Sequence, residues 1–269
     1  MEFNRFKRTI TNNRKFETSV KEALNEFNNR VQWSGDIPKI MKEIGKKLDV
    51  LIFEIPMKDS EFGAVYLDTT YSKYLLLNSN QPRSKMYFSF CHDLYHIIKG
   101  TPDYINERRE VYFNHEYTGD ENECKANLFA ANLLMPEYEF KKMYELYNND
   151  SEDTLYTIIK LMNYFNSPYV AVLLRLFELN IFGNDDLKGL NNFLELEMND
   201  VEKLFDELWI DKEILTPTLK DEMGHIFNII KKEGEYLLKK QLISEYDFKN
   251  IQKNIELFYN EIKLEGKDE

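Results

Sequence analysis

The sequence contains two histidines four positions apart, in the pentapeptide His92-Asp93-Leu94-Tyr95-His96. In a helix, this spacing puts both imidazoles on one face, one turn apart. Two imidazoles arranged in this way suit a single Zn²⁺, whose bonds to imidazole nitrogen are about 2.0–2.1 Å long. The alternative is that two buried histidines share a helix face by accident. The chain has only four His, so the spacing favours a metal site.

A catalytic zinc site needs a third protein ligand and an open position for water. The next predicted helix contains Glu123 and Asn127, which are four residues apart and therefore face the same way. We expect Glu123 to be the third ligand and Asn127 to orient an imidazole, because metal-bound histidines almost always have such a hydrogen-bonding partner. Glu121 competes as ligand. It points about 200° away from Glu123 on a helix, so only one of the two can face the site.

The segments before the histidine pair predict two helices and a small sheet. Apolar residues recur at helical spacing over residues 16–27 and 37–48. Short β-branched or aromatic runs follow at 50–55, 63–67 and 74–77, separated by turn-forming residues. The predicted fold class is α+β: a small mixed sheet of about three strands with a zinc-site helix and following helices, then an all-helical C-terminal region.

From Pro82 onward, nearly the whole pattern is helical. The predicted helices cover residues 84–99, 121–135, 153–165, 168–179, 186–196, 200–209, 218–240 and 245–264. A polar stretch at residues 148–151 indicates a loose boundary, which divides the chain into a zinc domain at 1–150 and a helical domain at 151–269. The second domain begins like a helix-turn-helix. Residues 151–209 carry four basic against eleven acidic residues, so we do not expect this segment to bind DNA.

Two segments match the pattern of a known family. Residues 88–96, FSFCHDLYH, are similar to a helical F-T-L-A-H-E-L-G-H segment, and residues 123–136, ECKANLFAANLLMP, match an E-x-x-A-N-x-F-A-A-x-L-L-M-P segment almost residue for residue. Both segments are typical of the ImmA/IrrE family of zinc metallopeptidases, and the resemblance covers roughly residues 37–182.

The resemblance implies a cytoplasmic zinc endopeptidase. It makes His92, His96 and Glu123 the zinc ligands and Asn127 the partner of a ligating imidazole. It also implies a regulatory protein substrate, typically a DNA-binding repressor.

The chain departs from the family pattern at Asp93. The family has Glu between the two histidines, where its carboxylate takes a proton from the attacking water. Asp is one methylene shorter, so its carboxylate falls back by about 1–1.5 Å, and a misplacement of about 1 Å can cost on the order of 100-fold in rate. Metal binding should survive, while catalysis is expected to be less efficient.

Two further residues are candidates for stabilising a developing oxyanion. Tyr95 stands where the family usually has Gly. Its hydroxyl could reach the cleft, but packing is the favoured interpretation because the chain uses Tyr freely in its core and on its surface. His115 lies in the loop that leads to Glu123 and could approach the metal, although a loop histidine is more often solvated. Cys91 and Cys124 neighbour proposed ligands but are turned about 100° away from the metal on their helices.

Composition limits the other possibilities. With 43% hydrophobic and 14% aromatic residues, the chain can form a core and is not expected to be disordered. Two cysteines and a charged start indicate a cytoplasmic protein. No stretch approaches the roughly 20 apolar residues of a membrane span. A net charge of −12 argues against direct nucleic-acid binding, and the basic start, residues 5–15, is interpreted as a solvated segment.

Three functions remain open from the sequence. The first is a zinc endopeptidase that acts on a regulatory protein. The second is a zinc-binding interaction module that binds such a protein without cutting it. The third is a helical interaction protein without a metal. The acidity is concentrated after Ser151, so we expect a basic, DNA-binding-type protein partner whose binding weakens with salt. The oligomeric state is not predicted.

Overall fold

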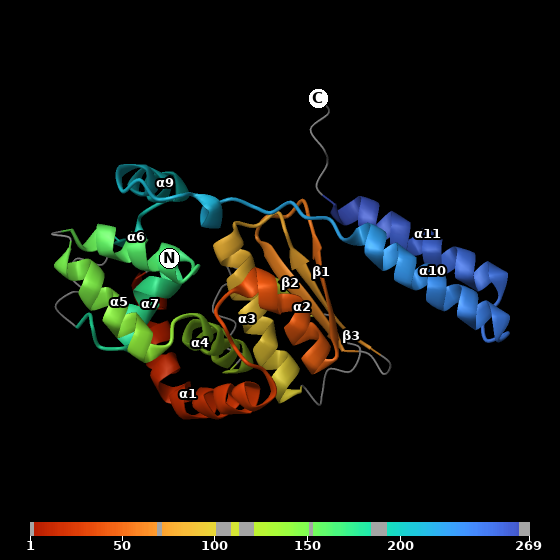
Figure 1. Cartoon of the computed structure of the whole chain (residues 1–269), viewed down its shortest axis with the longest axis horizontal. Helices are drawn as coiled ribbons and strands as arrows, with labels where there is room; N and C mark the ends of the chain where they lie inside the picture. The colour runs from red at the N-terminus through yellow and green to blue at the C-terminus, as the bar shows by residue number, and fades with distance from the viewer. Residues whose placement is uncertain are drawn as a thin grey trace.

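The computed structural model describes residues 3–68, 72–100, 109–112, 121–150, 153–183 and 193–263. Figure 1 shows a sheet beside its helices, with a helical hairpin extending to one side. The strands are β1 (Val50–Ile55), β2 (Phe62–Asp68), β3 (Lys73–Asn78) and β4 (Arg109–Tyr112). The helices are α1 (Phe3–Arg30), α2 (Ile37–Leu48), α3 (Arg83–Lys99), α4 (Glu121–Leu134), α5 (Glu137–Asn149), α6 (Thr154–Tyr164), α7 (Tyr169–Glu178), α9 (Met198–Glu207), the 3₁₀ helix η2 (Glu213–Leu215), α10 (Met223–Lys239) and α11 (Glu245–Ile262).

The sheet is mixed, as predicted. Its described strands have the order β1-β3-β2-β4; β1 runs parallel to β3, whereas β2 is antiparallel to β3 and β4. The three predicted strands are confirmed. Residues 109–112 add a fourth, in a stretch between two predicted helices to which the sequence assigned neither a helix nor a strand. This strand has only four residues and begins with the charged Arg109 and Glu110, and its pairing with β2 is a long-range contact that no local pattern specifies.

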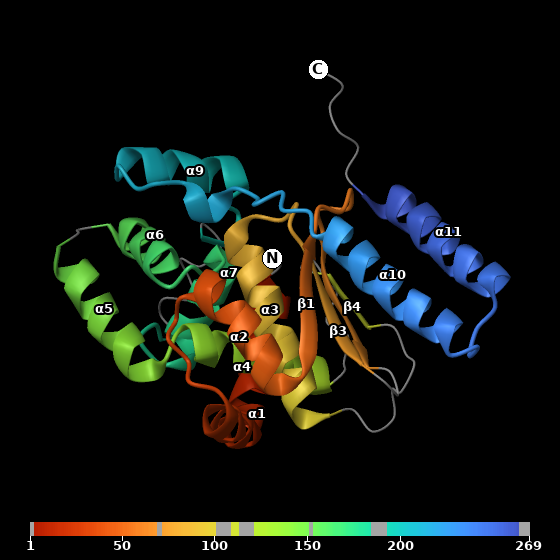
Figure 2. The ribbon, with the colours of Figure 1, turned by 45° about the vertical axis from the view of Figure 1, so that its right-hand side comes forward.

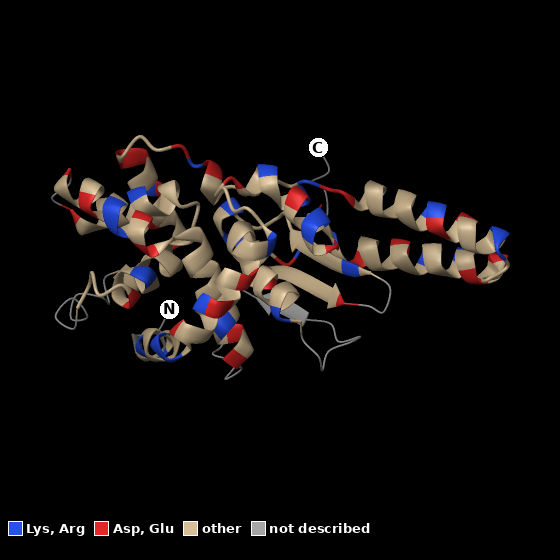
Figure 3. Ribbon diagram, turned by 60° about the horizontal axis from the view of Figure 1, so that its bottom comes forward, with Lys and Arg blue, Asp and Glu red and all other residues tan. Residues whose placement is uncertain are grey.

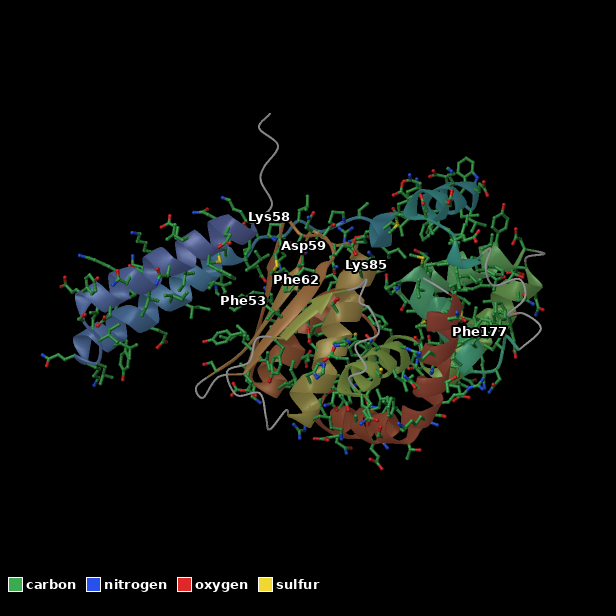
Figure 4. The ribbon with its side chains drawn as sticks, turned by 180° about the vertical axis from the view of Figure 1, so that it is seen from behind. Phe53, Lys58, Asp59, Phe62, Lys85 and Phe177 are labelled. Carbon is green, nitrogen blue, oxygen red and sulfur yellow. The ribbon has the colours of Figure 1, made fainter. Side chains whose placement is uncertain are left out.

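The two faces of the sheet contribute to different hydrophobic cores. Alternate residues of β2 and β3, such as Tyr66 and Leu75, face the main core around α3. Val65 and Leu76 face the opposite way, toward α10 and α11. Figure 2 shows α2 and α3 on one side of the sheet and the α10–α11 hairpin on the other. Figure 4 shows Phe53 between the sheet and this hairpin, where its ring centroid lies 6.0 Å from that of His225.

Helix α3 is the central helix of the main core. Fourteen of its 17 residues are buried, so it presents no broad solvated face and its polar side chains must be satisfied inside the protein. It begins directly after Pro82 and ends at Gly100, whose φ of +56° suits glycine. The predicted helix over residues 84–99 is therefore confirmed, and it holds His92 and His96 at its buried centre.

Two helical predictions need correction. The predicted helix at 218–240 begins only at Met223, because the preceding backbone bonds to the sheet: the N–H of Leu219 donates to the Ser79 carbonyl, and that of Glu222 to the Glu54 carbonyl. Helix α5 was not predicted as a separate element. The helix predicted at 186–196 lies largely outside the described residues. The capping box of α11, formed by Ser244 and Asp247, is present.

The basic N-terminal segment is part of helix α1 and is not simply solvated. Its Arg14 donates hydrogen bonds to the carbonyl of Phe177 and to Oδ1 of Asn180. The ring of Phe6 meets that of Phe177, labelled in Figure 4, at a centroid distance of 5.4 Å. Arg14 therefore binds the C-terminal end of α7, where a cation interacts favourably with the helix dipole.

The domain division at residue 150 stays a prediction. Phe140 before this position and Phe165 after it stack at 5.4 Å within the same hydrophobic core. No helix in the described part of the chain is long and apolar enough to cross a membrane.

Arg175 connects α7 to the end of α4, and its replacement should be strongly destabilising. The buried guanidinium donates to the carbonyl of Met135, to Asn132 Oδ1 and to Glu178 Oε2. Removing it leaves the Glu178 carboxylate buried without this partner. We expect Arg175→Ala to lower the free energy of unfolding by about 3–5 kcal/mol, measured by urea denaturation. If the free energy of unfolding fell no more than in the exposed control Lys203→Ala, Arg175 would not be a stabilising link between α7 and the end of α4.

Candidate metal centre

The candidate ligands come from two helices that pack against each other. His92 and His96 lie one turn apart on α3, and Glu123 lies in the first turn of α4. Figure 1 shows α3 and α4 next to each other, to the left of the sheet. One ligand atom from each of the three side chains lies within 4.8 Å of the others, which makes this a group of described residues able to hold a metal ion.

The distances within the group are short. Nε2 of His92 lies 3.1 Å from Glu123 Oε2, and Nε2 of His96 lies 3.3 Å from Glu123 Oε1. The two Nε2 atoms are 3.2 Å apart. In a tetrahedral zinc site with bonds of about 2.0–2.1 Å, neighbouring ligand atoms are about 3.3 Å apart. The spacing of these nitrogens and oxygens therefore fits a single zinc ion.

Asn127 fixes the orientation of His92. Nδ1 of His92 lies 2.9 Å from Asn127 Oδ1. Because a carbonyl oxygen can only accept, Nδ1 carries the hydrogen and donates it. In the neutral imidazole, Nε2 then presents a lone pair toward the Glu123 carboxylate and toward His96. A cation stabilises electron-pair donors that converge in this way, so the chemistry of the donor set also fits a metal.

The pKa shifts in the group follow from the short distances between a carboxylate and two imidazoles. Burial alone raises the pKa of the Glu123 carboxyl, but the hydrogen bonds and charges of the two histidines outweigh it and hold the pKa far below its usual range. Burial lowers the pKa of His92, but Glu123 outweighs this effect and raises it. Glu123 is therefore ionised, as a zinc ligand must be. Its side chain is 26% exposed while both histidines are buried, so solvent reaches the group from the Glu123 side.

The competition between the two glutamates is resolved by their positions. The Glu121 side chain is 58% exposed and pairs with Lys15 at 3.2 Å and with Lys125 at 3.6 Å. It points away from the histidines, as the helix geometry requires. Glu123 is the carboxylate that faces them.

Asp93 and Tyr95 are also buried on α3. Asp93 is fully buried; burial chiefly raises the pKa of Tyr66 on β2 and the Asp93 charge adds to it, while the same charge also favours a raised pKa of His92. Tyr95 is also buried; its ring lies 5.6 Å from that of His96 and 5.8 Å from that of Phe129. Tyr95 therefore packs among the helices. Its role as an oxyanion donor stays a prediction.

The remaining sequence candidates are placed as follows. His115 lies outside the described residues. Cys91 is fully buried, and burial raises the pKa of its thiol. Tyr66 on β2 was not singled out from the sequence; its hydroxyl donates to Asp68 Oδ2 on the same strand at 3.2 Å. The alternation of β2 would have placed Tyr66 on the face toward α3, but nothing local marks it as functional.

Two imidazoles and a carboxylate that converge from two packed helices are a ligand set of catalytic zinc sites. Residues 46–177 match the model of a peptidase family, the IrrE N-terminal-like domain, so the resemblance seen in the sequence is confirmed over this segment, which is of a metallopeptidase type. The matched segment begins in α2, ends in α7 and contains every candidate ligand. A comparison with curated proteins gave no match.

The hydrogen bond between Asn127 and His92 should contribute to metal affinity. Asn127→Ala removes the acceptor for Nδ1–H and frees the imidazole to rotate or to change tautomer. We expect zinc affinity to fall about 10–100-fold, measured by competition with a zinc chelator. Asn132→Ala on the same helix, which leaves the histidines untouched, is the matched control. Equal affinities in the two variants would exclude the orienting role.

Proposed function

We propose that the protein is a zinc-dependent endopeptidase that hydrolyses a peptide bond in a regulatory, repressor-type DNA-binding protein in the cytoplasm. The observation that carries this proposal is the convergence of His92, His96 and Glu123 at distances suited to one zinc ion. The family match supports a peptidase, and the acidic character of the chain supports a basic protein substrate.

The proposed roles follow from the chemistry of each side chain. Zinc, when bound, would polarise the attacking water and the peptide carbonyl. His92, His96 and Glu123 hold it, and Asn127 keeps His92 in the ligating tautomer. Asp93 accepts the proton of the attacking water and passes it to the leaving amine. We also propose Tyr95 and His115 as donors to the oxyanion.

A second candidate function is a zinc-binding interaction module that binds a regulator without cleaving it. Asp93 favours this candidate, because the family pattern has the longer Glu at this position. Its full burial limits how far the carboxylate can shift to compensate for the missing methylene. Both candidates require the metal, so activity separates them.

The test begins with protein purified without added zinc. Metal analysis should find about one zinc per chain, and its absence would exclude both candidates. The protein is then incubated with candidate repressor-type regulators from the same genome, beginning with the products of the genes next to its own, and the reaction products are analysed by mass spectrometry. A single cut that a chelator prevents supports the endopeptidase. Zinc-dependent binding of an uncut regulator supports the interaction module.

A further inference from the structure

Trp209 is the most exposed large apolar side chain in the described part of the chain. It is 95% exposed and directly follows α9. The chain has two Trp, and the other, Trp33, packs against Phe27 with ring centroids 6.0 Å apart. Because Trp is highly buried on average and enriched at binding hot spots, an indole left in water indicates a contact with another molecule.

The backbone at Trp209 is also unusual. Its φ is +56°, in the left-handed region where bulky residues are rare and Gly is usual. The N–H of Trp209 donates to the Asp206 carbonyl and that of Ile210 to the Phe205 carbonyl, which closes α9 in a Schellman motif. Gly would satisfy this motif at lower cost. The chain therefore accepts both an exposed indole and an unfavourable backbone at one position, which is the pattern of a residue kept for function.

The backbone on both sides of Trp209 is anchored in the fold. Phe205 near the end of α9 is fully buried, and Ile214 and Leu215 in η2 are buried after the connection. The capping box of Glu197 and Asp200 holds the start of α9. Less backbone ordering is then needed when a partner binds at Trp209, which favours affinity.

The surroundings of Trp209 are acidic. Residues 195–213 contain eight acidic and two basic residues, a net charge of 2 − 8 = −6, and Figure 3 colours acidic positions red along α9 and the connection after it. The two lysines already pair with acidic neighbours, Lys203 with Asp200 and Lys212 with Asp206. Glu207 and Asp211, two positions either side of Trp209, are exposed.

We propose that Trp209, with Glu207 and Asp211, is a docking surface for a Lys- or Arg-rich segment of a protein partner. The face of the indole attracts a cation, and the net charge of −6 over residues 195–213 draws Lys and Arg side chains to the same segment. Nucleic acids and anionic membranes are disfavoured, because their phosphates meet carboxylates here. The α10–α11 hairpin also has exposed aromatic residues, but Figure 3 shows acidic and basic positions mixed along it, so its charge selects no partner.

This surface is separate from the metal centre. The segment after Trp209 reaches the start of α3, where Arg83 Nη1 donates to the Glu213 carbonyl and to Thr216 Oγ1. His92 lies nine residues further along α3, about 13 Å at 1.5 Å per residue. If the partner is the regulator proposed above, this inference rests on the proposed function. The surface would hold the partner away from the metal centre. Binding of the partner at this surface can therefore be measured without cleavage.

The test measures binding in the Glu123→Gln background, where no cleavage is expected. The probe is a fluorescein-labelled Arg-rich peptide, compared with a Glu-rich peptide of the same length, by fluorescence anisotropy at low and high salt. Trp209→Gly should weaken binding of the Arg-rich peptide roughly tenfold or more. It should also raise the urea midpoint of unfolding, since Gly suits the left-handed position. Glu207→Gln with Asp211→Asn should weaken binding and reduce its salt dependence.

Tyr246→Ala is the matched control, because Tyr246 is a 74% exposed aromatic residue on α11. It should bind the peptide like the parent protein. Unchanged binding by Trp209→Gly, or an equal loss in Tyr246→Ala, overturns the proposal. A further result would also overturn the proposal: the parent protein forms a dimer, and Trp209→Gly abolishes the dimer but not peptide binding. The surface would then join two copies of this chain.

Discussion

Glu123→Gln is expected to lower zinc affinity by more than about 100-fold, because even the loss of a residue that only orients a ligand costs 10–100-fold. The substitution keeps the shape of the side chain but removes the charge that faces Nε2 of both histidines at 3.1 and 3.3 Å. Any peptidase activity should fall on the order of 1,000-fold, since a catalytic metal contributes several kcal/mol. Zinc content by atomic absorption and cleavage rate check the two effects separately.

Glu121→Gln is the matched control for this prediction. It makes the same chemical change two positions away on α4, at an exposed side chain paired with Lys15 and Lys125. We expect unchanged zinc content and activity, with at most a small loss of stability from surface ion pairs. His92→Ala should reproduce the loss of metal from the α3 side. A Glu123→Gln variant that keeps about one zinc per chain would show that the ion is bound at another site.

The ligand set was predictable because helix geometry is local. A spacing of four residues fixes which side chains share a face, so the pairs His92 with His96 and Glu123 with Asn127 followed from the sequence. Helix geometry also showed that only one of Glu121 and Glu123 can face the histidines, and the structure shows that it is Glu123. The sequence could not show that the two helices meet with these faces together. That juxtaposition depends on packing within the main core, and before the structure it was available only through the family resemblance.

The features that the sequence did not predict depend on long-range contacts. Strand β4 forms by pairing with β2, and the segment before α10 bonds to Ser79 and Glu54 instead of continuing a helix. The exposure of Trp209 was equally hidden, because an apolar residue at the end of an amphipathic segment normally indicates burial. Helix α1 was predicted in part, but its contact with the end of α7 was not.

The parts of the chain outside the family segment complete its fold. Helix α1 precedes residues 46–177 and contacts α4 and α7, while α10 and α11 follow it and cover the second face of the sheet. An uncovered sheet face with residues such as Val65 and Leu76 would expose apolar surface. The family segment therefore depends on flanking helices to bury the second face of its sheet.

The chemistry of residue 93 distinguishes the two proposed functions, and the test compares Asp, Asn and Glu at this position. If Asp93 is the general base, Asp93→Asn should lower the cleavage rate by about 10²–10⁴-fold, because Asn has nearly the same shape but cannot accept the proton. Asp93→Glu should restore the reach of the family's carboxylate and keep the rate or raise it by up to about 100-fold. Single-turnover cleavage of the regulator measures all three.

Burial makes the comparison more demanding. Asp93 is fully buried, so the extra methylene of Glu must fit a packed interior and can cost about 1–3 kcal/mol of stability. Urea denaturation and zinc content of each variant separate this cost from the chemistry. A stable, zinc-loaded Asp93→Glu that cleaves faster than the parent would show a peptidase slowed by one methylene. Three zinc-loaded variants with identical behaviour would exclude Asp93 as the base, and the interaction module would then be the better account of this metal centre.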